Sequence, residues 1–105
     1  MSGRPKHTRK DQNQSAIVEE LRQLGFLAFD VADNASLGFD LVVIGLHRRW
    51  MLPMALLVEV KSEGGKLTER EEEVAAEMQY RFGDEAPLIV AQTTERVLEW
   101  FHART

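Results

Sequence analysis

The chain contains no cysteine, and this absence limits the kinds of site that it can form. Without thiols it has neither a disulfide framework nor a thiolate metal site, so any metal ion must be bound by oxygen or by histidine nitrogen. The three histidines, His7, His47 and His102, are scattered along the sequence. They lack the spacing of zinc ligands, so we do not expect a zinc site.

Long hydrophobic runs are also missing. The longest, residues 50–58, contains Pro53 and is far shorter than the roughly 20 residues that cross a bilayer. The N-terminus has basic residues without the apolar segment of a signal peptide behind them. We therefore expect a soluble, cytoplasmic protein with a single domain over residues 11–105.

The chain also lacks the net positive charge that is typical of nucleic-acid-binding proteins, since its formal net charge is −4. The charges are nevertheless segregated, because the acidic excess lies in residues 63–77 and residues 1–10 have no acidic residue. The cations of residues 1–10 are Arg4, Lys6, Arg9 and Lys10. We interpret residues 1–10 as a flexible basic tail that binds DNA, although a polar, solvated terminus would have the same composition.

Hydrophobic periodicity defines the expected helices and strands. Ile17, Val18, Leu21 and Leu24 recur at helical spacing, and Gly25 follows as a stop. In chain order, the expected elements are a helix over 11–24, strands over 27–31, 39–46 and 54–61, a helix over 68–81, a short buried strand over 88–91 and a helix over 94–102. This order predicts an α/β fold with a mixed central sheet flanked by helices.

Two local signals refine this arrangement. Residues 47–53 have the period of neither a helix nor a strand, so we expect the strands on either side to form a hairpin with a long tip. Thr68, followed three residues later by Glu71, forms a capping box at the start of the second long helix.

Charged residues interrupt the apolar strand over residues 54–61. Because strand side chains alternate, Glu59 and Lys61 project to the same face. A hairpin folded about Arg49 and Trp50 pairs residues whose numbers add to about 99, which places Asp40 opposite Glu59. Two converging carboxylates repel each other unless a cation lies between them, and Mg²⁺ is commonly bound by carboxylates.

Lys61 has a separate expected role beside such a metal ion. Its ammonium group can polarise an attacking water and stabilise negative charge in a transition state. The alternative is that Glu59 and Lys61 form a structural ion pair, with Asp40 as a cap at the start of its strand.

The first helix offers two further polar residues. Its inward line runs through Gln14, Leu21 and Leu24, and one turn further back lies Asp11. We expect Asp11 and Gln14 to point toward the sheet and the candidate active site. The alternative is that they form a capping pair, and both roles can hold together.

Three blocks of sequence resemble a known family. They are residues 38–45 (GFDLVVIG), 57–62 (LVEVKS) and 64–68 (GGKLT). They are similar to the G-x-PD, E-V-K and G-K-L-[ST] blocks of the VRR-NUC branch of the PD-(D/E)xK nucleases, an arrangement that archaeal Holliday junction resolvases share. Residues 10–18 also resemble the opening of small phage proteins of that branch.

The resemblance implies a restriction-endonuclease-like core and a DNA endonuclease that uses Mg²⁺ or Mn²⁺, with branched DNA as the favoured substrate, in a bacterial or phage-infected cell. By this resemblance Asp40, Glu59 and Val60 would be metal ligands, and Lys61 would be the catalytic lysine. A non-catalytic DNA-binding accessory subunit with the same fold is the alternative.

The sequence departs from the family pattern at two positions. Phe39 stands where the family usually has proline, which changes only a local backbone restriction. Gln14 stands where resolvases carry a helix glutamate, which leaves Asp11 as a candidate substitute and Gln14 as a residue that could orient a water.

The predicted hairpin tip and the glycine-rich loop supply candidate partner contacts. Arg48 and Arg49 lie next to Trp50, a combination suited to contact with a nucleic-acid backbone and to stacking, although an exposed arginine-rich turn is the ordinary alternative. Lys66 follows Gly64 and Gly65 and is a further candidate for DNA binding.

Symmetric cleavage of a four-way junction requires two active sites. A homodimer therefore follows if the protein is a resolvase. Met51, Leu52 and Met54 are candidate interface residues, because they combine large apolar side chains with a position near the hairpin tip.

Deletion of residues 1–10 tests the predicted basic tail. We expect weaker DNA binding and a flatter salt dependence, because each lost phosphate contact lowers the log–log slope by roughly 0.9 on duplex DNA. Binding titrations over a range of salt concentrations measure this slope. A slope equal to that of the full chain would show that the tail does not contact DNA.

Overall fold

The protein is described by a computed structural model that covers the backbone of residues 9–104 and the side chains of residues 12–104. The main elements are α1 (Arg9–Gln23), β1 (Leu27–Asp30), β2 (Leu41–His47), β3 (Leu52–Val60), α2 (Glu69–Phe82), β4 (Leu88–Ala91) and α3 (Thr94–His102). Two short 3₁₀ helices, η1 (Ala35–Leu37) and η2 (Gly83–Glu85), lie in the connections. The predicted order of helices and strands is confirmed.

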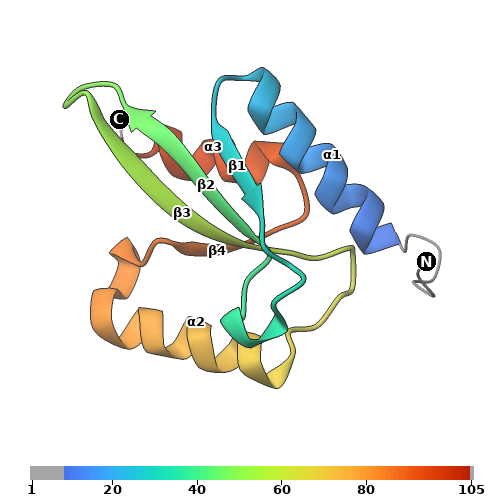
Figure 1. Cartoon of the computed structure of the whole chain (residues 1–105). Helices are drawn as coiled ribbons and strands as arrows, with labels where there is room; N and C mark the ends of the chain where they lie inside the picture. Colours follow the sequence, from blue (N-terminus) through green and yellow to red (C-terminus); the bar gives the residue numbers. More distant parts are fainter. Residues whose placement is uncertain (1–8, 105) are drawn as a thin grey trace.

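The four strands form one mixed sheet in the order β1-β2-β3-β4. The first three strands are antiparallel, and β4 runs parallel to β3 after the crossover through α2. Helices α1 and α3 cover one face of the sheet, and α2 lies on the opposite side (Figure 1). The predicted mixed α/β sheet is therefore confirmed. Within residues 9–104, no helix combines the length and the apolar character needed to span a bilayer.

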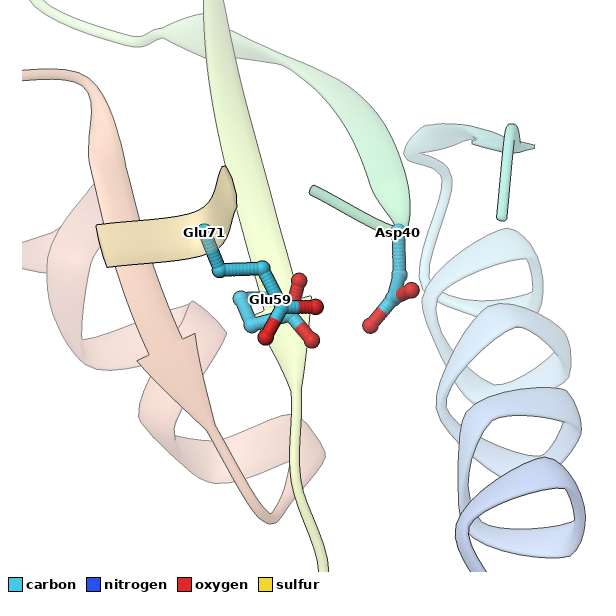
Figure 2. A group of neighbouring side chains, drawn as sticks. All are labelled: Asp40, Glu59 and Glu71. Atoms are coloured by element: carbon cyan, nitrogen blue, oxygen red, sulfur yellow. The ribbon is translucent and has the colours of Figure 1, made fainter. Parts of the chain in front are cut away.

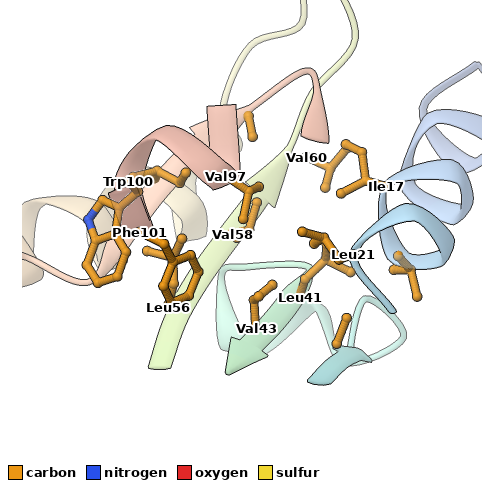
Figure 3. Packing of buried hydrophobic residues seen from close by; sticks show 14 residues of the cluster. Ile17, Leu21, Leu41, Val43, Leu56, Val58, Val60, Val97, Trp100 and Phe101 are labelled. Carbon is orange, nitrogen blue, oxygen red and sulfur yellow. The ribbon is translucent and has the colours of Figure 1, made fainter. Parts of the chain in front are cut away.

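The hydrophobic core lies between the sheet and the pair α1 and α3 (Figure 3). Among the helix residues, Ile17, Leu21, Trp100 and Phe101 are buried in it. The sheet contributes alternate residues of its two central strands, namely Leu41, Val43, Leu56, Val58 and Val60. Because strand side chains alternate, the residues between them face the α2 side.

Helix α2 is attached to the rest of the fold in a different way. None of its residues 69–82 is fully buried, and its half-buried apolar residues are Val74, Ala75 and Met78. Its N-terminal half contacts the connection between β1 and β2, where Arg70 Nε donates to the Ser36 carbonyl oxygen at 2.6 Å. Gly38 lies so close to α2 that a Cβ there would be 2.5 Å from Val74 Cγ2.

The prediction of a long hairpin tip over residues 47–53 is wrong. The ladder between β2 and β3 continues as far as the pair His47 and Leu52, and only residues 48–51 form the turn. Pro53 is tolerated in β3 because β4 pairs only with residues 57–60, so β3 has a single neighbour at Pro53 and one free edge.

Two predicted burials are also wrong. Leu24 was expected on the inward line of the first helix, but its side chain is 58% exposed because α1 ends at Gln23 and the chain turns at Gly25, with φ at +95°. Strand β4 is buried on one face only, since Val90 on the α2 side is 44% exposed. The reason is that β4 lies at the edge of the sheet, where α2 does not fully cover it.

Substitution of Gly38 by alanine tests the approach of α2 to the sheet. Gly38 has a φ of +79°, and its added Cβ would also lie 3.1 Å from the Arg70 carbonyl oxygen, which is backbone and cannot swing away. We expect G38A to lower the free energy of unfolding by roughly 2–5 kcal/mol, combining left-handed strain with overpacking.

Gly25 provides the matched control for G38A. It also has a positive φ, but a Cβ there would meet nothing within 4 Å. G25A should therefore cost only the strain, roughly 1–2 kcal/mol. Chemical denaturation measures both values, and equal losses would show that the contact with α2 contributes nothing.

Candidate active site

Asp40 lies at the start of β2, facing β3. The register pairs Leu41 with Val58, and one further step places Asp40 opposite Glu59, as predicted. The Asp40 amide donates to the Val58 carbonyl oxygen at 2.9 Å, and Asp40 Oδ2 accepts from the Val60 amide at 2.8 Å. Asp40 is 5% exposed. Its carboxylate is therefore held in place by the backbone of the neighbouring strand.

Glu59 of β3 and Lys61, the first residue after β3, project to the same face of the sheet, as the alternation predicts. Both are buried, with relative exposures of 2% and 8%. Lys61 Nζ lies 3.2 Å from Glu59 Oε1. The opposite charges offset part of the free-energy cost of removing each group from water.

A third carboxylate, that of Glu71, joins this group from the first turn of α2. Its Oε1 accepts from Lys61 Nζ and from the Thr68 amide, both at 2.8 Å, and its side chain is 11% exposed. The predicted capping box is confirmed, because the Glu71 amide also donates to Thr68 Oγ1. This second role of Glu71 has no signal of its own in the sequence, since capping alone accounts for a glutamate at this position.

The three carboxylates converge on one point (Figure 2). One oxygen each from Asp40, Glu59 and Glu71 lies within 4.8 Å of the other two. Carboxylate oxygens are the ligands that Mg²⁺ and Mn²⁺ prefer, with water and phosphate oxygens completing the coordination. The residues present therefore fit a hard divalent cation.

Val60 can contribute to such a site only through its backbone. Its side chain is fully buried in the core on the other face of the sheet. Its amide donates to Asp40 Oδ2. Because the N–H and C=O of a strand residue face the same neighbour, the Val60 carbonyl is also directed toward the Asp40 side. The predicted ligand role of Val60 is compatible with this direction.

The environment of Glu71 keeps its carboxyl group ionised. Burial raises the pKa of Glu71, but the hydrogen bonds from Lys61 and from the Thr68 backbone, together with the charge of Lys61, outweigh burial and hold this pKa well below its ordinary value of 4.5. Glu71 is therefore available as an anionic partner of Lys61 over the physiological pH range.

Of the two candidate residues of the first helix, only Gln14 has a described side chain. The Asp11 side chain lies outside the described residues, so its predicted role stays a prediction. Gln14 is buried, and its amide nitrogen donates to Asp30 Oδ2 at 2.9 Å. Asp30 pairs with the core residue Leu41, so this contact lies on the α1 side of the sheet, whereas Glu59 projects toward the α2 side.

The candidate DNA-binding residues are spread over the molecule. Arg48 and Arg49 are exposed at the hairpin tip, where the Arg49 guanidinium lies 5.2 Å from the centroid of the Trp50 ring. The length of β2 separates this tip from Asp40 by roughly 25 Å. Lys66 is exposed in the loop that follows Lys61. Arg4 and Lys6, and the side chains of Arg9 and Lys10, lie outside the described residues.

The candidate interface residues differ in their surroundings. Met51 and Leu52 are 67% and 60% exposed in the single chain, so both are accessible to a partner. Met54 is half-buried and packs against the core, so its apolar surface is partly used within the chain.

Comparison with protein-family models, with curated proteins and with solved structures finds no match to this chain.

The pH dependence of stability without divalent metal tests the environment of Glu71. Because the pKa of Glu71 is lower in the folded chain than its ordinary value of 4.5, its stabilising contribution is present above about pH 4.5 and is lost as the pH falls toward 2. In E71Q this loss should disappear, so the difference between wild type and E71Q should shrink over that range. Denaturation at a series of pH values measures this difference, and a constant difference would contradict the assignment.

Proposed function

We propose that this protein is a metal-dependent endonuclease that hydrolyses phosphodiester bonds in DNA. The observation that carries the proposal is the convergence of buried carboxylates from Asp40, Glu59 and Glu71 beside the Lys61 ammonium. Buried charges of this kind are costly, and such clusters are common at functional sites. Asp40, Glu59 and Lys61 also stand at the matching positions of the PD-(D/E)xK pattern that the sequence resembles.

Asp40 and Glu59, with Glu71 beside them, are the residues that would hold Mg²⁺ or Mn²⁺. When bound, the ion supplies positive charge that neutralises phosphate oxygens and favours ionisation of water. Asp40 is oriented for this task by the Val60 amide, which fixes one of its oxygens. Glu59 is held by its position in the centre of the sheet between β2 and β4.

Lys61 would act on the reacting phosphate directly. An ammonium group has three N–H donors, and the contacts with Glu59 and Glu71 account for two of them. The third can donate to the attacking water or to a phosphate oxygen, where it stabilises the negative charge that develops in the transition state.

DNA is the proposed substrate, and branched DNA is its favoured form. The support is the motif resemblance together with the cationic residues at the hairpin tip and in the loop after Lys61. A homodimer is proposed with it, because symmetric cleavage of a junction requires two sites. The exposed Met51 and Leu52 supply apolar surface for such a contact.

One observation favours the alternative of a non-catalytic DNA-binding subunit. The Lys61 ammonium contacts both Glu59 and Glu71, so it offsets part of their negative charge without any metal ion. A structural ion-pair network would have the same contacts. Cleavage assays with linear, single-stranded, flap and four-way DNA, each with Mg²⁺ and with chelator, decide between the two functions.

The variants Asp40→Asn and Glu59→Gln test the proposed metal site. Each removes a ligand charge while keeping the shape of the side chain, so we expect cleavage to fall at least roughly a hundredfold while the circular dichroism spectrum is unchanged. Glu77→Gln in α2 is the matched control, since Glu77 is exposed and pairs only with Arg81 among the described contacts. Metal-dependent cleavage at the wild-type rate in D40N or E59Q would disprove the site.

A further inference from the structure

Lys61 needs to be held in place if it is to act on a phosphate. A lysine side chain is a flexible four-carbon stem with a rotatable head, so its position depends on what its ammonium contacts. Two carboxylate oxygens contact it here, Glu59 Oε1 at 3.2 Å and Glu71 Oε1 at 2.8 Å. The shorter contact comes from α2 and not from the strand that carries Lys61.

Glu71 is itself held by the start of α2. Its Oε1 accepts from the Thr68 amide at 2.8 Å, and its own amide donates to Thr68 Oγ1 at 3.2 Å. The positive end of the helix dipole also favours a carboxylate in the first turn. The orientation of the Glu71 carboxylate is therefore set by helix backbone and not by a free rotamer.

The same contact joins α2 to the central sheet. No residue of α2 is fully buried, and its other described polar contact at the N-terminal end is with the loop carbonyl of Ser36. The charged hydrogen bond between Glu71 and Lys61 is thus a direct polar link between α2 and β3. Charge-assisted hydrogen bonds are roughly twice as strong as neutral ones.

We propose that Glu71 is a positioning residue that orients the Lys61 ammonium toward the scissile phosphate and that requires its negative charge to do so. This inference rests on the proposed nuclease function. Glu71 Oε1 already accepts two hydrogen bonds, so its task is to hold Lys61, while Asp40 and Glu59 bear the main part of metal binding. The capping role of Glu71 is separable, because glutamine serves equally in a capping box.

The variant Glu71→Gln separates charge from capping. It keeps a side-chain oxygen for the Thr68 amide but removes the anion that Lys61 contacts. We expect the single-turnover rate at saturating DNA and Mg²⁺ to fall roughly 10- to 100-fold, as displaced catalytic groups do. The affinity for DNA and the Mg²⁺ concentration for half-maximal rate should change less than about twofold.

A double-mutant cycle with Lys61→Ala tests whether Glu71 acts through Lys61. In the K61A background, E71Q should cause no further loss of rate, because the residue that it positions is gone. The melting temperature of the metal-free proteins gives a second readout. The losses from K61A and from E71Q should be markedly non-additive there too, because the two side chains form one contact.

Thr68→Ala is the matched control for the capping box. It removes the acceptor of the Glu71 amide but leaves the carboxylate and its contact with Lys61. We expect T68A to lower the melting temperature by roughly 4–8 °C and to keep a rate near that of the wild type well below melting. E71Q should show the opposite pattern, with a large loss of rate.

Several results would overturn the positioning role. They are an unchanged rate in E71Q, a rate loss in the double mutant equal to the product of the single losses, or a rate that excess Mg²⁺ restores, which would make Glu71 chiefly a metal ligand. Wild-type protein that cleaves none of the DNA substrates with any divalent metal would instead overturn the proposed function. The melting cycle would then still decide whether Glu71 holds Lys61, and additive losses would refute that contact.

Discussion

The contact of one ammonium with two buried carboxylates is the interaction on which the site depends. Glu59 and Lys61 are charged residues in the central strand of a sheet, and Glu71 brings another charge into nearly complete burial. Without Lys61 the two glutamates would face each other in a poorly solvated space, where repulsion between like charges is strong. The lysine contacts both, reduces this repulsion and also joins the end of β3 to α2.

Because side chains alternate along β3, one face of the sheet carries core residues and the other carries the charged residues of the site. Val58 and Val60 enter the core beneath α1 and α3, and Glu59 and Lys61 face α2 from the same four-residue stretch. A slip of one residue would exchange the two sets and place both charges in the core. The hydrophobic core therefore enforces the register that brings Asp40 opposite Glu59.

Most of the secondary structure and part of the site were predictable from local pattern. The hairpin register followed from the positions of two apolar strands, and it correctly brought Asp40, Glu59 and Lys61 to one face. The capping box at Thr68 and the strand over Leu88–Ala91 were also identified by local signals. The errors lie at ends of elements. Leu24 and the hairpin tip depend on where packing stops, and sequence periodicity does not mark that point.

The residues that reach the site from other elements are brought there by packing between those elements. Glu71 is ten residues beyond Lys61, and local pattern explained it as a helix cap, yet the packing of α2 beside η1 brings its carboxylate to the lysine. Gln14 had the right helical phase to point inward, but its partner is Asp30 on the α1 side. Charged residues that share a strand or a hairpin can be placed together from the sequence, because backbone geometry relates them directly. Contacts between separate elements depend on how those elements pack in three dimensions, which no local spacing encodes.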